Sequence, residues 1–235
     1  MMNQHCFFVT GTDTDAGKTY VSALLLQGYT ALGITALGAK PLAAGAEQAA
    51  DGSLQNSDAL LLQQHSGIAL PYAQINPICY QAPVAPHLAA VNEQRHLDER
   101  LLNHALQTWQ SLNVQQLLIE GAGGWLLPIN AQRYLADWVA GHNLPVLLVV
   151  GMKLGCLNHA MLTVREIERS GCKLIGWVAN CMDAEMPALQ DNIHSLSARI
   201  PAPCLGVVPW LDSPQPEAVA AALHIDSVAQ LFSQT

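Results

Sequence analysis

The chain has 235 residues, 51% of them apolar and 12% charged, with a formal net charge of −8 at pH 7. This length and composition predict one domain over residues 1–235 and exclude a disordered chain. The acidic balance argues against nucleic acid or an anionic membrane as a partner. No apolar run reaches the ~20 residues that span a bilayer, and the N-terminus lacks a basic region followed by an apolar core, so we expect a cytoplasmic protein.

The first elements predict a phosphate-binding loop. An apolar run at 6–9 is followed by a polar loop from Gly11, then by Gly-Lys-Thr at 17–19 and an apolar-rich segment at 20–26. Strand, loop and helix in this order suit an anion, because the first N–H groups of a helix have no partner within it. Lys18 would reach the outer phosphates and Thr19 would ligate Mg²⁺. An ordinary strand-to-helix turn with a surface lysine is the alternative, because five residues rather than four separate the two glycines.

A second strand is expected at 35–40, where Pro41 ends it. Lys40 then lies at the carboxyl edge, where α/β sheets bind ligands, unless it is only a solvated strand end. Residues 42–55 read as a loop. Asn56 or Ser57 would cap a helix at 59–65, with Asp58 in its first turn either as a favourable charge or as a metal ligand.

Residues 76–87 contain three prolines and are expected to be irregular, as binding loops often are. Residues 98–112 have the spacing of an amphipathic helix. The side chains expected on its apolar face are Leu101, Leu102, Ala105, Leu106 and Trp109.

A third strand at 116–120 ends in Glu120, just before the glycine-rich segment 121–125. An acidic residue at this place suits a carboxylate that holds Mg²⁺ or orients its water, and the glycines allow close approach to phosphate. An ordinary exit from a strand is the alternative.

The last strands are expected at 145–150, 174–180 and 204–208. A helix after 151–159 offers a second anion site, to which Lys153 adds charge. Asn180 and the residues after 208 would form a nucleobase pocket, because an amide both donates and accepts. Further helices are expected at 188–199 and 216–223. Alternating strands and helices indicate an α/β fold, a P-loop NTPase-like mostly parallel sheet with helices on both faces.

The six cysteines form no C-x-x-C pair and the nine histidines show no zinc spacing. We therefore expect a protein of a reducing compartment, in which the cysteines are small buried side chains rather than disulfides or metal ligands.

Several segments together resemble the dethiobiotin synthetase family. They are V-T-G-T-D-T-x-x-G-K-T at 9–19, K-P at 40–41, N-S-D-A-L at 56–60, E-G-A-G-G-W at 120–125, V-V-G-M-K-L-G-C-L-N-H-A-M-L-T at 149–163, W-V-A-N at 177–180 and I-P-A-P-C-L-G-x-x-P-W-L at 200–211. The resemblance covers nearly the whole chain except 183–197 and the last ~20 residues, and K-L-G-C-x-N-H and P-W-L are its most specific parts.

This resemblance implies an ATP- and Mg²⁺-dependent ligase of biotin synthesis. Such an enzyme condenses CO₂ with 7,8-diaminopelargonic acid through a carbamate and a carbamic-phosphoric anhydride, giving dethiobiotin, ADP and phosphate. It also implies a homodimer with the diamine at the subunit interface.

The resemblance assigns roles to individual residues. Lys18 and Lys40 would be catalytic, and Thr19, Asp58 and Glu120 would hold Mg²⁺. The nucleotide would contact Thr14, Asp15, Ala16, Gly17, Lys18, Thr19, Tyr20, Asp58, Glu120, Gly121, Ala122, Gly123, Asn180, Pro209, Trp210 and Leu211. The substrate would contact Thr12, Lys40, Ala44, Gly121 and, from the partner subunit, Leu154, Gly155, Cys156, Leu157 and Asn158.

The chain also departs from the family pattern. Asp15-Ala16 stands in place of Glu-Val, Ala44 in place of a serine, and Asn192 near the place of a substrate-binding tyrosine, while Glu217 is a late acidic residue near the expected nucleotide. Two other readings are a switch or partitioning ATPase, which would hydrolyse ATP without a diamine, and a non-catalytic nucleotide-binding paralogue. The two lysines and three metal ligands argue against the paralogue.

Overall fold

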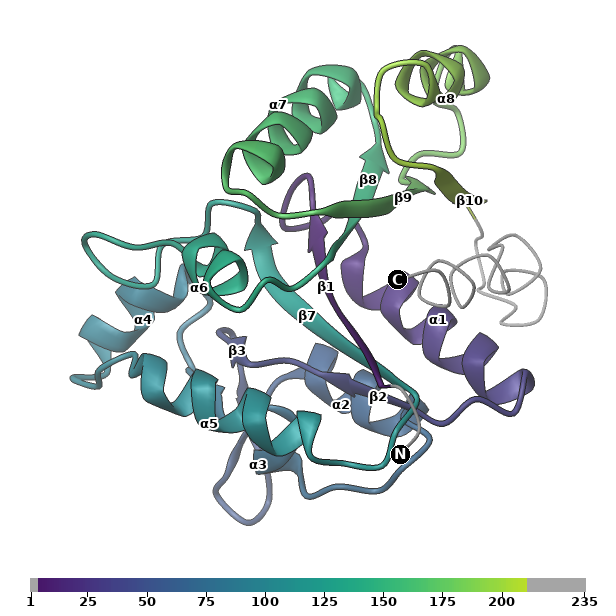
Figure 1. Ribbon diagram of the computed structural model, residues 1–235. Coiled ribbons are helices and arrows are strands. Elements are labelled where there is room, and N and C mark those ends of the chain that lie inside the picture. The colour runs from purple at the N-terminus through teal and green to yellow at the C-terminus, as the bar shows by residue number, and fades with distance from the viewer. Residues whose placement is uncertain (1–3, 211–235) are drawn as a thin grey trace.

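The computed structural model describes residues 4–210, and its centre is a six-stranded sheet (Figure 1). Every pairing in this sheet is parallel, and the strand order is β10-β9-β8-β1-β7-β2. The strands are β1 (His5–Gly11), β2 (Ala36–Ala39), β7 (Gln116–Gly124), β8 (Val146–Met152), β9 (Leu174–Cys181) and β10 (Cys204–Val208). All six expected strands are confirmed, and the parallel sheet confirms the α/β fold class.

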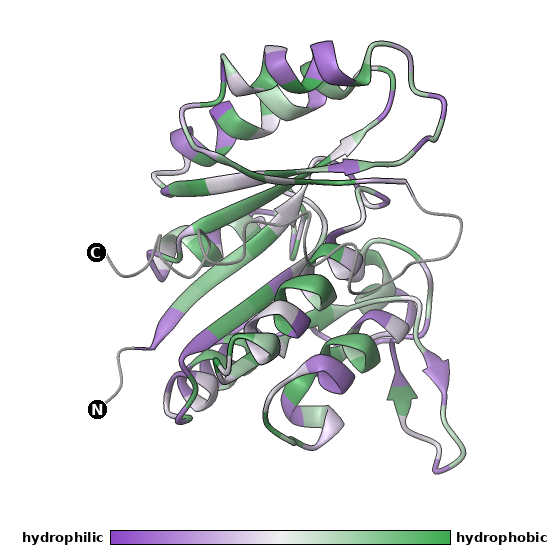
Figure 2. Cartoon of the chain, turned by 90° about the vertical axis from the view of Figure 1, so that its right-hand side faces the viewer, coloured by the Kyte–Doolittle hydropathy of each residue, from purple (hydrophilic) through white to green (hydrophobic). Residues whose placement is uncertain are grey.

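Helices cover both faces of the sheet because successive residues of each buried strand face opposite sides. In β1, Phe7 packs with α1 (Lys18–Ala31) and α2 (Ser57–His65), whereas Phe8 packs on the other face. That other face is covered by α4 (Pro86–Asn92), α5 (Glu99–Gln110), α6 (Leu135–Gly141), α7 (Cys156–Arg169) and α8 (Leu189–Ser197). Figure 2 shows the strands largely hydrophobic and the helices with hydrophilic segments.

The segments expected to be loops contain more structure than their composition indicates. Within 42–55 lie β3 (Leu42–Ala43), β4 (Glu47–Gln48) and β5 (Leu54–Gln55), and near the prolines lie α3 (Tyr72–Ile75) and β6 (Ile78–Cys79). The expectation that 76–87 has no regular structure is therefore wrong. Pro86 begins α4, where a proline is tolerated because the first N–H of a helix has no partner.

Several local expectations are tested by the helix and strand ends. The Asn56 side chain caps α2 by accepting from the Ala59 N–H at 3.3 Å, and Asp58 lies in the first turn, as expected. β7 continues through Gly124 rather than ending at Glu120, because Gly11 pairs with Gly124 after a register shift. Leu101 is 47% exposed instead of facing the core, whereas Leu102, Leu106 and Trp109 are buried.

The remaining expectations concern cysteines, membranes and the C-terminus. All six cysteines are free; four are buried, and Cys6 and Cys204 are half-buried. Among the helices of residues 4–210, none has the length and apolar character needed to cross a membrane. Leu211, Glu217 and the helix expected at 216–223 lie outside the described residues.

Candidate active site

The loop between β1 and α1 has the backbone of an anion-binding site. Gly17 precedes α1 with φ 83°, a left-handed conformation that side chains disfavour. A Cβ on Gly11 would approach the Asp13 carbonyl oxygen and Lys18 Cγ to 3.0 Å, so a larger residue here would press on the loop. Thr12 Oγ1 accepts from the Gly151 N–H at 3.2 Å and ties the loop to the end of β8.

Lys18 lies folded over this loop. Its Nζ donates to the carbonyl oxygens of Asp13 and Thr14, each at 3.2 Å, and its side chain is buried. Burial, followed by the positive charge of Lys40, lowers the pKa of Lys18 to about 8. Within residues 4–210 no carboxylate pairs with this ammonium, so it is suited to pair with the phosphates of a nucleotide.

A second lysine is paired with two carboxylates at the same edge of the sheet. Lys40 Nζ lies 2.6 Å from Glu120 Oε1 and 3.0 Å from Asp58 Oδ2. Burial opposes the positive charge of Lys40, but the two carboxylates outweigh it and its pKa is raised. Thr19 Oγ1 donates to Glu120 Oε1 at 2.8 Å, which links the start of α1 to this pair.

The strand order explains why these residues meet. β7 lies between β1 and β2, so Glu120 on β7 is flanked by the loop after β1 and by Lys40 just after β2. Carboxyl ends of parallel strands share one edge, where α/β sheets bind ligands. Asp58 reaches this edge from the first turn of α2.

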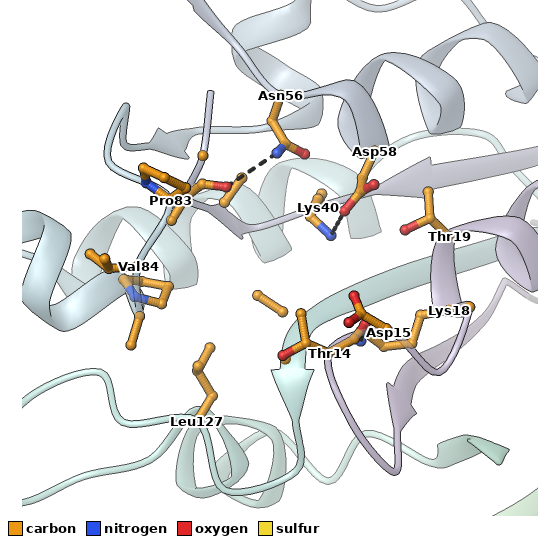
Figure 3. Close-up of a pocket in the computed structure, with 18 of the residues that line it drawn as sticks. Thr14, Asp15, Lys18, Thr19, Lys40, Asn56, Asp58, Pro83, Val84 and Leu127 are labelled. Atoms are coloured by element: carbon orange, nitrogen blue, oxygen red, sulfur yellow. Dashed lines mark hydrogen bonds and ion pairs between the residues drawn. The ribbon is translucent and has the colours of Figure 1, made fainter. Parts of the chain in front are cut away.

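A cavity of about 690 Å³ opens at this edge. Figure 3 shows Thr14, Asp15 and Lys18 on one side of it and Pro83, Val84 and Leu127 on the other, with Lys40 and Asp58 on the wall between them. Its lining also includes Gly17, Thr19, Tyr20, Ala43, Ala44, Gly45, Asn56, Ala85, Pro86, Ala122 and Gly123. The cavity therefore has a charged half and an apolar half.

A smaller pocket of about 240 Å³ adjoins this cavity, and Gly17 and Tyr20 line both. Its other lining residues are Asn180, Cys181, Met182, Pro209 and Trp210. Asn180 Nδ2 donates to the Ala16 carbonyl oxygen at 3.0 Å, so the end of β9 holds the phosphate-binding loop. The amide expected in a nucleobase pocket therefore lies beside that loop, together with apolar and aromatic side chains suited to a flat ring.

One expected group of residues lies apart from both pockets. Leu154–Asn158 form the turn before α7 and its first residues; Leu154 is 97% exposed, and none of the five lines either pocket. Asn192 lies exposed on α8, where its Nδ2 donates to the Ala188 carbonyl oxygen. Gly121 packs under Phe8, the Cζ of which would lie 2.7 Å from an added Cβ.

Sequence reasoning also missed some residues of the site. Leu127 follows the glycine-rich segment and completes the apolar wall, and nothing in its local pattern indicates this position. Lys153 was expected only to add charge near α7, but its Nζ lies 3.1 Å from Asp13 Oδ2. This ion pair joins the turn before α7 to the phosphate-binding loop. Sequence reasoning also gave no role to Tyr72 or Asn76.

The oxygen atoms at Thr19, Asp58 and Glu120 fit a small divalent cation. Glu120 is fully buried, and its Oε2 has no hydrogen-bond partner among the described residues, although Oε1 has two. A buried carboxylate oxygen left unpaired is costly, and hydroxyl and carboxylate oxygens are ligands that Mg²⁺ prefers. Residues 4–210 contain no cluster of three His, Cys, Asp or Glu suited to a metal, and this set has only two carboxylates.

Comparison with known proteins shows which family the chain is similar to. A family described as an AAA domain matches residues 5–218. The ATP-dependent dethiobiotin synthetase of Cellvibrio japonicus is 49% identical over 96% of this chain and 97% of its own. The enzymes of that name from Salmonella typhimurium and Pseudomonas aeruginosa are 45% and 44% identical, each over 94% of this chain and 95% of theirs.

Solved structures of lower identity share the fold. The MinC:MinD complex of Aquifex aeolicus contains a chain with TM-score 0.55 and 14% identity, matched over 98% of this chain and 96% of that one. Chloroplast FtsY from Physcomitrella patens has TM-score 0.52 and 16% identity over 94% of this chain and 65% of its own. Because identity extends at more than 40% along nearly the whole chain and the lysine–carboxylate cluster lies at the end of a parallel sheet, the chain is an enzyme that belongs to the ATP-dependent dethiobiotin synthetase family.

Proposed function

We propose that this enzyme uses ATP to close 7,8-diaminopelargonic acid and CO₂ into the cyclic urea dethiobiotin, releasing ADP and phosphate. The observation that carries this proposal is the pairing of Lys40 with Glu120 and Asp58 beside the loop that holds Lys18. Two cations in one partly apolar cavity suit a reaction in which negative charge moves between a phosphate and a small organic acid.

The proposed reaction has three steps. One amine nitrogen bonds to the carbon of CO₂ and loses a proton, which gives a carbamate. A carbamate oxygen then bonds to the γ-phosphorus of ATP as the bond to ADP breaks. The second amine finally attacks the carbamoyl carbon, phosphate leaves with the electron pair, and a second proton is lost as the ring closes. The first step is an addition to CO₂, and the next two are displacements at phosphorus and at the carbamoyl carbon. Positioning and charge neutralisation accelerate all three.

The chain's own residues would divide these tasks. Lys18 would pair with the β- and γ-phosphates, helped by the N–H groups of the 14–18 loop. Lys40 would stabilise the carbamate and the charge that develops on the transferred phosphoryl group. Thr19, Asp58 and Glu120 would hold Mg²⁺, which supplies positive charge against the phosphates. Asn180, Pro209 and Trp210 would hold the adenine ring.

We propose one domain over residues 1–235 and a cytoplasmic homodimer in which Leu154–Asn158 of one subunit reach the diamine bound to the other. Supporting this, Leu154, Gly155 and Asn158 are exposed at the start of α7, although Cys156 is buried, and the segment lines neither pocket of its own subunit. A helix N-terminus also suits the carboxylate of the substrate.

The decisive test is ADP release by the purified protein with Mg²⁺-ATP and bicarbonate, with and without 7,8-diaminopelargonic acid. We expect ADP and dethiobiotin to form together and only when the diamine is present. Equal ADP release without the diamine would favour the switch-ATPase reading and overturn the proposal. ADP binding with no turnover would favour the non-catalytic paralogue.

The role of Lys40 has its own variant. We expect Lys40→Ala to abolish turnover while ADP binding by calorimetry stays close to wild type, because Lys40 lies outside the phosphate-binding loop. Lys173→Ala is the matched control, since Lys173 is exposed, and its turnover should be normal. Normal turnover in Lys40→Ala would contradict the role given to this lysine.

A further inference from the structure

A chain of hydrogen bonds outside the cavity holds the main chain at Lys40. β2 ends at Ala39, so Lys40 is not held by the sheet, and Pro41 after it has no N–H. Instead, the Lys40 N–H donates to the Ile75 carbonyl oxygen at 2.9 Å. The Lys40 carbonyl oxygen accepts from Asn76 Nδ2 at 2.7 Å. Residues 75 and 76 therefore fix both main-chain polar groups of the lysine.

The Asn76 side chain has one orientation that satisfies its neighbours. It is buried, and its Nδ2 also donates to the Ile78 carbonyl oxygen at 3.1 Å. Carbonyl oxygens only accept, so Nδ2 must face Lys40 and Ile78, which leaves Oδ1 to accept a hydrogen bond. Tyr72 supplies it: its hydroxyl donates to Asn76 Oδ1 at 2.8 Å.

The same hydroxyl continues the chain to the helix that carries Asp58. Tyr72 Oη accepts from the Asn56 N–H at 2.8 Å, and Asn56 is the capping residue of α2. Asp58 follows two residues later and pairs with Lys40 at 3.0 Å. Asn76 and Tyr72 therefore connect the main chain of the lysine with the helix start that positions its carboxylate partner, Asp58. Figure 3 shows the resulting Lys40–Asp58 pair.

We propose that Asn76 and Tyr72 are positioning residues that set the placement of Lys40 relative to Asp58 for the proposed ring closure. Neither residue lines the cavity, so they act through Lys40 and Asp58 rather than on the substrate. The effect on turnover rests on the proposed function, whereas the placement of the two side chains does not. A displacement of about 1 Å at a reacting group lowers rates by up to roughly a hundredfold.

The first test is the variant Tyr72→Phe, which removes only the hydroxyl that joins Asn76 to Asn56. We expect kcat to fall about tenfold to a hundredfold. The KM for ATP should change by less than kcat does, because Lys18 and the phosphate-binding loop are not part of this chain of bonds. Tyr29→Phe is the matched control: its hydroxyl is buried without a hydrogen-bond partner among the described residues, and its kcat should be normal.

A second variant shows whether the two residues act as one unit. Asn76→Ala removes the donor to Lys40, and combining it with Tyr72→Phe should lower kcat no further than Asn76→Ala alone. Independent roles would instead multiply the two losses. A normal kcat in Tyr72→Phe, or losses that multiply, would overturn the proposal. So would a rise in KM for ATP as large as the fall in kcat, accompanied by a lower melting temperature, which is the result of general loosening.

Crystal structures of wild type and Tyr72→Phe give a readout that needs no activity. We expect the Lys40 Nζ to Asp58 Oδ2 distance to lengthen beyond roughly 3.5 Å in the variant. An unchanged pair would overturn the positioning role even if turnover fell. Wild-type protein that makes no dethiobiotin would instead count against the proposed function, and the crystallographic comparison would still decide this inference.

Discussion

Gly17 shows how much of the site depends on one residue, because it lines both the large cavity and the smaller pocket. It has φ 83°, and a Cβ added there would collide with Asn180 Nδ2. We therefore expect Gly17→Ala to weaken ADP binding at least tenfold and to lower the free energy of unfolding by about 1–2 kcal/mol through the left-handed conformation alone. Calorimetry with ADP and thermal unfolding measure the two effects.

Gly33→Ala separates the two causes. Gly33 has φ 71°, but an added Cβ there would meet no atom of residues 4–210 within 4 Å. This control should lose stability to a similar degree and bind ADP normally. Wild-type ADP binding by Gly17→Ala would contradict the inferred contact with Asn180.

At the scale of elements, the six sheet strands could be predicted because parallel strands buried on both faces are nearly continuous apolar runs. The same rule about the carboxyl edge of the sheet predicted a ligand-binding place for Lys40, which the structure puts beside Glu120. By contrast, β3 and β6 pair across more than 30 residues, and α3 is too short for a periodic pattern. The chain of bonds from Tyr72 to Lys40 depends on those elements, so no local pattern could have indicated it.

The packing of α1 and α2 on β2 gives a prediction at this scale. A Cβ on Gly38 would lie 2.6 Å from Leu26 Cδ1 and 3.3 Å from Leu62 Cβ, so both helices approach the strand at this glycine. We expect Gly38→Ala to destabilise the protein by about 1–3 kcal/mol in chemical denaturation, because an overpacked core must shift. In Gly141→Ala the added Cβ meets no atom within 4 Å in the part of the chain that the structure describes, and this α6 variant should be at least as stable as wild type. Equal stability of the two variants would refute the packing argument.

At the scale of the whole molecule, one subunit contains the lysine–carboxylate cluster but leaves Leu154–Asn158 outside its cavity. If a second subunit supplies this segment, each site combines residues of two chains. Asn158→Asp should then weaken diamine binding by repelling its carboxylate, while the added charge suits the helix start and keeps the fold. Lys40→Ala should inactivate the other part of the same site, which is the lysine–carboxylate cluster supplied by the first chain.

Mixing these two variants therefore tests the shared site. Random reassortment makes half of the dimers hybrid, and each hybrid has one intact site, so diamine-dependent activity should recover to roughly a quarter of wild type. The matched control mixes Lys40→Ala with Glu120→Gln. Lys40 and Glu120 contact each other within one chain, so their hybrids contain no intact site and should stay inactive. Dimers that exchange subunits without regaining activity would show that each chain completes its own site, and the diamine would then have to bind without Leu154–Asn158.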